Sequence, residues 1–357
     1  MHGIGGYESG VRRLVLEQAR TWSRLRPDVE FGLFVRCEAG AEAAWESETN
    51  VVAVQSSRWA MPGRLIAREL LSVQLARWKP DVVYLRHSTI SPSVVALAAA
   101  VPTVLGGDLD DLDELRVRSR LRFRYMLLTR RWLLRYVRRI VVVTHEIARH
   151  PSIADSGVPV SVLPNSIDLD DYPPLSAPDN AEPHLVFIGA PGLPWAGVDK
   201  VVRMARLFPN WRFDIIGTGA GDLSNAPGNV TAHGELTRER YRPIMQRADV
   251  AIGPLALHRK NLHEASALKV AEYLAHGIPV ILGCPEAAFP EGAPFLLQLP
   301  NAEDNVELSV DAIGAFVAAW RGRRVSRDDI SPISSDVVEG ERLRLLLAEV
   351  RRPAEGT

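Results

Sequence analysis

The sequence predicts an α/β protein with two Rossmann-like domains, each built on a parallel sheet, that face each other across a central cleft. Short apolar runs alternate with helical segments, which favours parallel sheets with helices on both faces. A stretch rich in Pro, Asp and Asn interrupts the alternation, which then restarts. The predicted parts are an N-terminal domain over 1–165, a linker over 166–183, a C-terminal domain over 184–320, and a helical tail over 321–357. The tail is a candidate to pack back on the N-terminal domain.

The N-terminal domain is expected to begin with an amphipathic helix, because residues 11–25 carry apolar side chains at helical spacing. Apolar runs bounded by turn-forming residues then predict strands, and the segments between them predict helices. The expected strands cover 31–37, 51–55, 81–85, 102–107 and 140–144, and the expected helices cover 61–78, 94–100 and the Arg-rich stretch 116–140.

The C-terminal domain repeats this alternation. Its apolar runs predict strands, and the intervening amphipathic segments predict helices that cover the sheet. The expected strands lie within 184–190, 211–221, 229–234, 249–255 and 279–283, and the expected helices within 198–208, 238–248 and 266–276. In open parallel sheets, ligands bind beyond the carboxyl ends of the strands, so we expect the chemistry there.

Composition excludes several classes of protein. The 357 residues are 46% hydrophobic and 24% charged, as in a soluble globular protein. No apolar run approaches the roughly 20 residues of a membrane-spanning helix, and the N-terminus does not resemble a signal peptide. Cys37 and Cys284 form neither a metal-binding spacing nor a disulfide framework, so we expect a cytoplasmic protein.

Two glutamates separated by seven residues are the most informative pair. If a helix begins near Ser266, Glu264 precedes it and Glu272 lies about two turns inside. The N–H groups of the loop and first turn, at Ser266, Ala267 and Leu268, would attract a diphosphate, and a carboxylate would suit sugar hydroxyls. Alternatively, both glutamates are ordinary helix-surface residues.

The segment that contains these glutamates, EASALKVAEYLAHGIPVI, resembles the E-x7-E motif of retaining GT-B glycosyltransferases, particularly family 4. Three further stretches resemble that family in the same order: one ending in LPNSIDL, a βαβ unit from HLVFIGA to WRFDIIGTGAG, and NVTAHGELTRERYRPIMQRADVAIGPL. The resemblance is strong over about 140–285 and weaker over 5–115. It implies a nucleoside diphosphate sugar as co-substrate, with no metal ion and no other cofactor.

The resemblance also assigns roles to residues. Glu272 is expected to bind the donor ribose, and Glu264 to contact the transferred sugar. If both side chains face an open cleft, replacing them should leave the melting temperature unchanged. Gly10 and the turn from Gly217 to Gly219 are expected to let the backbone approach the donor. The residues expected to border its base are His233, Gly234, Glu235 and Leu236. For the glycines, turn formation is the alternative role.

The sequence departs from the family where the diphosphate should be neutralised. The usual Arg and Lys positions are occupied by Ala190 and Ala196. Arg259, Lys260 and Lys269 lie near the motif and are candidate replacements, although each can equally be a solvated surface charge. The residues before the glycine loop at Gly10 are too few and too rich in glycine to form the strand that precedes this loop in the family. We therefore expect either that the chain begins downstream of the natural start or that the first sheet lacks its usual central strand.

His87 follows an expected strand at its carboxyl end. The resemblance makes it a candidate catalytic residue beside the acceptor or sugar, whereas a lone histidine is often structural. The acidic run from Asp108 to Asp111 superficially resembles the metal-binding D-x-D motif of other glycosyltransferases. A solvated helix N-terminus is the favoured interpretation of this run.

The Arg-rich stretch 116–140 holds ten arginines and no acidic residue, in an N-terminal half with 23 Lys and Arg against 17 Asp and Glu. As one helix, it would place Met126, Leu133, Val137 and Ile140 on an apolar face. That face either packs on the sheet or docks, with Trp132 and Tyr136, on an anionic membrane at the inner face. Nucleic acid is not expected, because no base-reading motif accompanies the charge.

These observations predict a retaining glycosyltransferase that moves a hexose-like sugar to the hydroxyl of a small-molecule, glycan or lipid-linked acceptor. Front-face attack assisted by the leaving phosphate is the mechanism that the resemblance implies. Two alternatives stay open: a non-catalytic homologue that acts as a partner subunit, and a sugar-nucleotide epimerase of the same fold.

Overall fold

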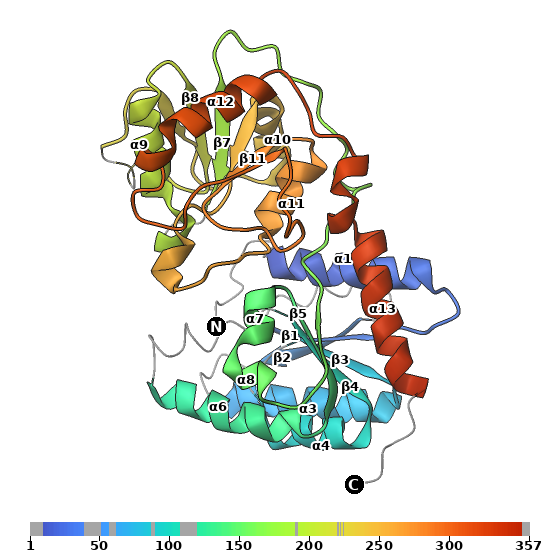
Figure 1. The fold of residues 1–357 in the computed structure, drawn as a ribbon. Helices are drawn as coiled ribbons and strands as arrows, with labels where there is room; N and C mark the ends of the chain where they lie inside the picture. The colour runs from blue at the N-terminus through green and yellow to red at the C-terminus, as the bar shows by residue number, and fades with distance from the viewer. Residues whose placement is uncertain are drawn as a thin grey trace. The chain divides into compact units, whose positions relative to one another are not determined.

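The computed structural model divides the chain into two units (Figure 1). Unit 1 comprises residues 1–163 together with 335–357, and unit 2 comprises 164–334. The structure describes residues 10–38, 51–56, 62–86, 90–107, 120–189, 192–219, 221, 223 and 225–351. Residues 1–8, on which the question of a missing first strand depends, lie outside these ranges.

Unit 1 contains parallel strands flanked by helices. One sheet has the order β3-β4-β5-β6, and β1 and β2 form a separate parallel pair. The strands are β1 (Leu33–Glu38), β2 (Val51–Ser56), β3 (Val83–Arg86), β4 (Thr103–Gly107), β5 (Val137–Val142) and β6 (Val160–Val162), and the helices are α1 (Gly10–Leu25), α3 (Pro62–Trp78), α4 (Pro92–Ala100), α6 (Arg120–Leu134), α7 (His145–Arg149), α8 (Pro151–Ala154) and α13 (Ser335–Arg351).

The Arg-rich stretch is not one helix, which corrects the expectation for 116–140. Helix α6 ends at Leu134, and residues 137–142 form the buried central strand β5. Val137 and Ile140 are part of the core between the sheet and α6. β-branched side chains fit a pleated sheet better than a helix, and here this preference outweighs the helical spacing of the arginines.

Helix α13 completes the core of unit 1, although it is 171 residues away in sequence from the preceding part of that unit. Leu343 and Leu346 pack with Trp22 of α1 and with the sheet. The buried Glu339 accepts hydrogen bonds from Gln18 Nε2 (2.7 Å) and Trp22 Nε1 (3.1 Å), and also pairs with Arg342 (3.0 Å). A charge as buried as that of Glu339 requires such partners, so the position of α13 is specified by polar as well as apolar contacts.

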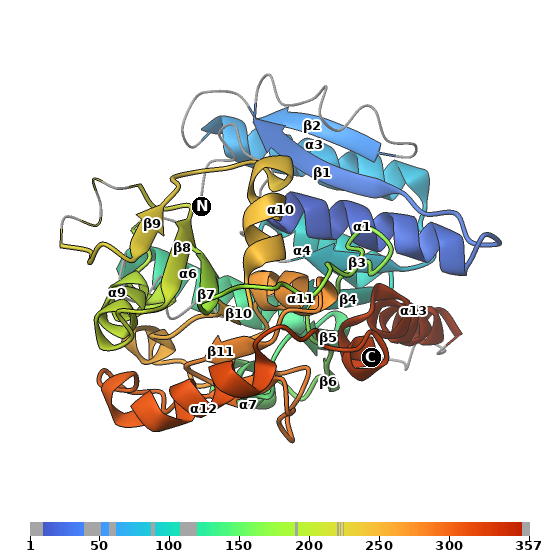
Figure 2. The same cartoon turned by 90° about the horizontal axis from the view of Figure 1, so that it is seen from above.

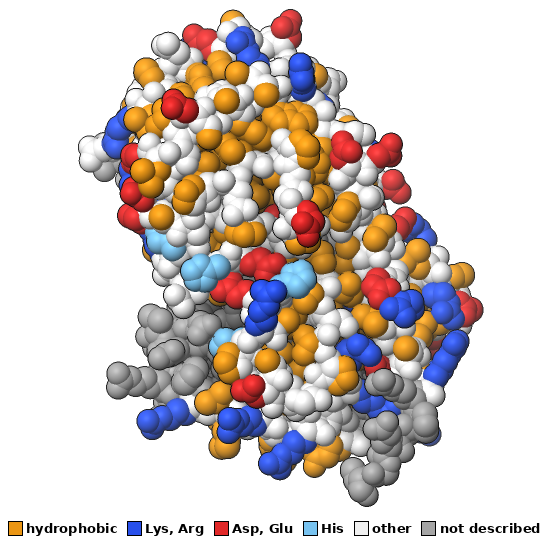
Figure 3. Space-filling model, viewed as in Figure 1, with side chains coloured by type: hydrophobic (Ala, Val, Ile, Leu, Met, Phe, Trp, Pro, Cys, Tyr) orange, Lys and Arg blue, Asp and Glu red, His pale blue; other side chains and the backbone are white. Residues whose placement is uncertain are grey.

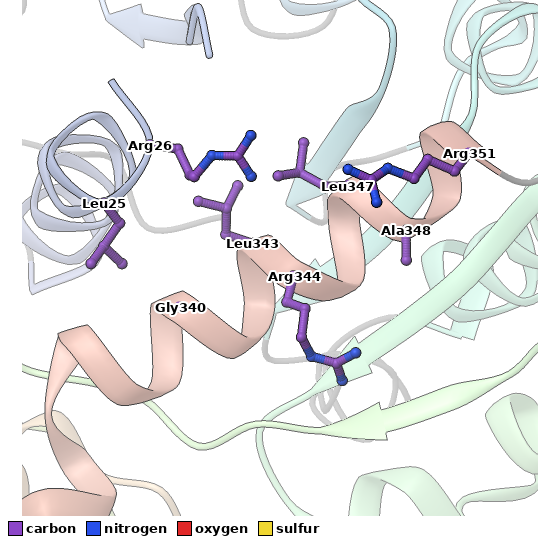
Figure 4. Close-up of a pocket in the computed structure, with 8 residues that line it drawn as sticks. All are labelled: Leu25, Arg26, Gly340, Leu343, Arg344, Leu347, Ala348 and Arg351. Carbon is purple, nitrogen blue, oxygen red and sulfur yellow. The ribbon is translucent and has the colours of Figure 1, made fainter. Parts of the chain in front are cut away.

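A groove of about 580 Å³ runs between α1 and α13 (Figure 4). Two arginines that line the groove already form ion pairs: Arg26 pairs with Asp28 (2.6 Å), and Arg344 pairs with Glu341 (2.5 Å). The groove is lined by Leu25, Arg26, Gly340, Leu343, Arg344, Leu347, Ala348 and Arg351. None of the residues expected to bind the donor lines it.

Unit 2 is a six-stranded parallel sheet of order β12-β11-β10-β7-β8-β9 with helices on both faces (Figure 2). Its strands are β7 (His184–Ile188), β8 (Arg212–Ile216), β9 (Val230–Ala232), β10 (Val250–Ile252), β11 (Val280–Leu282) and β12 (Leu296–Gln298), and its α-helices are α9 (Val198–Leu207), α10 (Arg238–Arg247), α11 (Leu268–Ala275) and α12 (Val310–Trp320). Four short 3₁₀ segments occur among the described residues of this unit: η1 (Pro194–Ala196), η3 (Leu257–Lys260), η4 (Glu307–Ser309) and η5 (Asp328–Ile333).

The boundaries differ from the expected ones. Residues of the expected linker, Ile167, Tyr172 and Leu175, are buried in the core of unit 2, because their apolar side chains outweigh the Pro-rich character of the segment. Residues 321–334 also belong to unit 2, and the tail enters unit 1 only from Ser335.

Candidate functional site

Three loops meet at the carboxyl edge of the sheet in unit 2. Gly217, after β8, has a φ of +89°, and its N–H donates to the carbonyl of Gly234 (2.6 Å) after β9. Gly189, after β7, donates its N–H to Ile216 (2.9 Å). A Cβ on Gly217 would lie 2.0 Å from the Gly189 carbonyl oxygen, so the loops can pack this closely only because a glycine stands there. Gly219 ends the same turn.

Replacing Gly217 by alanine should therefore destabilise unit 2. The left-handed backbone and the steric overlap together should lower the free energy of unfolding by about 3 kcal/mol. Gly292→Ala is the matched control, because Gly292 has a φ of +77° with open space around it and should lose only about 1 kcal/mol. Urea unfolding of both variants tests this, and equal losses would contradict the steric argument.

Helix α11 is fixed to the end of β7 by two side chains one turn apart. Lys269 donates from Nζ to the Ile188 carbonyl (2.7 Å), and the Ile188 N–H donates to the Tyr273 hydroxyl (2.7 Å). The Lys269 ammonium also lies 4.7 Å above the centre of the Phe187 ring. The first turn of α11 is therefore held at the carboxyl edge of the sheet, where the first N–H groups of a helix have no partner within the helix.

The charge of Lys269 is not balanced by any carboxylate in the described part of the chain. Burial lowers the pKa of this lysine to about 8. A partly buried ammonium whose neighbours are a carbonyl and an aromatic face is stabilised by any anion that approaches it. Lys269 therefore makes this edge of the sheet a place where an anion is favoured.

The other two candidate cations are placed differently. Arg259 binds Asp199 (2.8 Å) and Glu303 (2.6 Å), which raise its pKa, and it donates to the Pro194 carbonyl (2.8 Å). Lys260 lies 4.6 Å above the Trp195 ring. The Arg259 charge is thus neutralised within an ion-pair network.

The loop before α11 is clamped from two sides. The Asn165 N–H donates to Ser266 Oγ (2.8 Å), and Asn165 Nδ2 donates to the Ser266 carbonyl (2.7 Å). On the other side, Ala265 forms a parallel bridge with Glu286. Helix α11 begins at Leu268, two residues later than expected, and the Ala267 N–H already faces the Glu286 carboxyl group (3.4 Å).

Asn165 and Glu286 are thus residues that sequence reasoning missed. Both are buried, and burial together with the neighbouring Glu264 charge raises the pKa of Glu286 to about 8. A neutral acid beside Glu264 allows the two carboxyl groups to lie close together. The only sequence signal for Asn165 was its place in the LPNSIDL stretch.

Glu272 does not face an open cleft, which corrects that expectation. Its side chain is 6% exposed, and its Oε1 accepts a hydrogen bond from the Tyr241 hydroxyl (2.6 Å) of α10. Glu264, in the loop, is partly exposed. The two glutamates therefore differ in environment, with one tied into the helix layer and the other near the surface.

The base-side residues lie at the β9 edge. His233 Nε2 is 2.7 Å from Asp214 Oδ1, so the imidazole is oriented by a carboxylate on the neighbouring strand. Leu236 packs against the core cluster that includes α10 and α11. Ala196, in η1, is also buried.

The remaining candidates fall elsewhere. Gly10 begins α1 in unit 1. His87, Ala190 and the acidic run 108–111 lie outside the described residues. Within the ranges that the structure describes, no group of three or more His, Cys, Asp or Glu side chains is placed to hold a metal ion.

Several solved structures resemble the chain over nearly its full length. The chain matches the structure of sucrose-phosphate synthase from Thermosynechococcus elongatus with a TM-score of 0.67, at 13% identity over 95% of this chain and 94% of that one. It matches Anabaena HepE in complex with UDP with a TM-score of 0.64, at 14% identity over 96% and 98%. It also matches UDP-GlcNAc 2-epimerase from Neisseria meningitidis bound to UDP-GlcNAc, with a TM-score of 0.53 at 13% identity over 94% and 97%.

These likenesses show the GT-B fold. No curated protein sequence matches the chain significantly. Family models match both halves: residues 9–171 match Glycosyltransferase Family 4, and residues 182–314 match Glycosyl transferases group 1. The chain therefore belongs to the GT-B glycosyltransferases, with a family 4 domain followed by a group 1 domain.

Proposed function

We propose that the protein transfers a sugar from a nucleoside diphosphate donor to an acceptor hydroxyl with retention of anomeric configuration, and that unit 2 binds the donor. The observation that carries this proposal is the Lys269 ammonium at the carboxyl end of β7, which has no acidic partner among the described residues. Two proteins of the same fold were solved with UDP and with UDP-GlcNAc, which supports a donor of this class.

In this proposal, Lys269 and the first-turn N–H groups of α11 hold the diphosphate and stabilise the charge that develops as it leaves. The lysine takes the place of the cations missing at Ala190 and Ala196, and of a metal ion. The Ser266 hydroxyl accepts from Asn165 and keeps its own proton for a donor oxygen. Glu264 contacts the transferred sugar, and Glu272 contacts the ribose.

The first test identifies the donor. Thermal-shift measurements with UDP-, GDP-, ADP- and dTDP-sugars should give one nucleotide class that raises the melting temperature. With that donor and candidate acceptors of the small-molecule, glycan and lipid-linked classes, the anomeric configuration of the product tests retention. Absence of stabilisation by every donor would contradict the proposal.

Glu264→Ala should act mainly on turnover. Because its expected partner is the sugar that moves, its loss should lower kcat by about 10- to 100-fold and change donor affinity little. Glu291→Ala, an exposed carboxylate of the same unit, is the control and should have wild-type kinetics. A rise in KM with unchanged kcat would contradict this role for Glu264.

The two alternatives give distinct outcomes in the same assays. An epimerase, which the Neisseria structure keeps open, would convert the sugar nucleotide without any acceptor. A non-catalytic partner subunit would neither convert nor transfer the donor and would bind another transferase. We propose action in the cytoplasm.

A further inference from the structure

Helix α6 (Arg120–Leu134) presents an apolar stripe to solvent. Tyr125, Leu128 and Trp132 follow one another at intervals of three and four residues, which places them on one face of α6, and Tyr136 follows in the turn after the helix ends. Leu128 is 72% exposed, and the three aromatic side chains are 41–44% exposed. Exposed apolar side chains that are scattered singly need no explanation, whereas a stripe of three along one helix, continued by Tyr136 in the next turn, indicates a contact surface.

This stripe is not the face that the sequence suggested. Leu133, Val137 and Ile140, expected on the apolar face, are buried in the core of unit 1, together with Leu134. Leu128 and Trp132 lie on the solvent side of α6 and belong to none of the core clusters among the described residues. Tyr125 is held in place, because its hydroxyl donates to the Ile90 carbonyl (2.7 Å).

Arginines border the stripe on the same face. Arg124, Arg131 and Arg135 are exposed, and none pairs with an acidic side chain in the described part of the chain. No Asp or Glu occurs from residue 120 to 136. By contrast, Arg139 pairs with the Glu349 carboxylate of α13 (2.9 Å), and Arg138 donates to the backbone carbonyl of Glu349 (2.9 Å).

The surroundings of α6 leave this face accessible within unit 1. Its neighbour α4 exposes only small side chains there, Pro92, Ala96 and Ala99. Figure 3 shows Lys and Arg side chains gathered with hydrophobic ones along the edge of unit 1 where α6 runs in Figure 1. The face is therefore both basic and apolar from Arg124 to Trp132.

We infer that this face of α6 docks on an anionic lipid surface, with the helix lying parallel to the membrane. Leucine and aromatic side chains at this spacing enter the boundary between headgroups and acyl chains, while the arginines contact lipid phosphates. No described helix is long and apolar enough to cross a bilayer, so this contact would hold the protein at the surface. The inference is independent of the donor site in unit 2.

Sedimentation of the full chain with phosphatidylcholine vesicles, with and without phosphatidylglycerol, tests the inference. Binding should require the anionic lipid and should weaken as salt is raised. Arg131→Ala with Arg135→Ala should lower the partition constant about 30-fold, since each basic residue contributes about fivefold. Leu128→Glu should lower it about tenfold or more, because the apolar contact is lost.

Matched controls lie in unit 2. Leu308 is 68% exposed, and Leu308→Glu should bind vesicles as the wild type does. The pair Arg247→Ala with Arg323→Ala removes two exposed charges from unit 2 and should have little effect. Equal sedimentation with neutral and anionic vesicles would overturn the inference. Two further results would overturn it, each together with no binding to vesicles. One is self-association that the α6 variants abolish, and the other is binding to double-stranded DNA that they abolish.

Discussion

Lys269→Ala is expected to weaken binding of the best nucleotide sugar by roughly 10- to 150-fold, since charge-assisted hydrogen bonds contribute about 1.5–3 kcal/mol. The reason is that Lys269 brings a positive charge without an acidic partner to the end of β7, where the diphosphate is proposed to bind. Calorimetric titration at neutral pH measures the loss. Lys260→Ala is the control, and unchanged affinity there would single out Lys269 among the candidate cations.

The same lysine predicts a pH dependence. Burial lowers the pKa of Lys269 to about 8 in the donor-free protein, so the ammonium is present below that pH and is lost above it. Donor affinity should therefore be nearly constant below about pH 7 and fall as the pH rises through about 8. Lys269→Arg keeps its charge and should remove most of this decline. A decline that is identical in Lys269→Arg would assign it to another group.

Glu272→Ala should have two separate effects. If the carboxylate accepts hydrogen bonds from ribose hydroxyls, donor affinity should fall roughly 10- to 150-fold. The variant also leaves the buried Tyr241 hydroxyl without its acceptor, which should lower the free energy of unfolding by about 1–3 kcal/mol. Calorimetry and urea unfolding measure the two effects, and Glu272→Gln should lose less of both.

Tyr241→Phe separates the two roles of Glu272. It removes the same hydrogen bond while leaving the carboxylate in place, so stability should fall and donor affinity should change little. If Glu272→Ala loses stability but keeps full affinity, the carboxylate serves only to join α10 to α11. The assignment of the ribose contact would then be wrong.

The sheet of unit 2 was predictable because its strands are short buried apolar runs between turn-forming residues. HLVFI, VAI and VIL have no polar side chain at their centres, as expected of central parallel strands covered on both faces. The glycine turn after β8 also followed from the sequence, since only glycine tolerates such close loop packing as Gly217 makes.

Other features depend on contacts that a linear pattern does not contain. The end of α6 and the start of β5 were missed because arginines continue across the boundary, whereas burial of Val137 and Ile140 decides the structure. Asn165 and Ser266 are hydrogen-bonded although they are 101 residues apart in the sequence, so no local pattern indicates the pair. Similarly, the spacing of Glu264 and Glu272 could not show that Tyr241 buries the second carboxylate.

The chain enters unit 2 after Leu163 and leaves it before Ser335, and near these points Ile167 and Ser334 are joined by a backbone bridge. Unit 2 is therefore a topological insertion within unit 1, with its entry and exit side by side. A protein cut before Ser335 would keep unit 2 whole and deprive unit 1 of Glu339, Leu343 and Leu346. The natural fragment for separate expression is the inserted segment 164–334, whereas a conventional division into N-terminal and C-terminal halves would leave the first half with an open core.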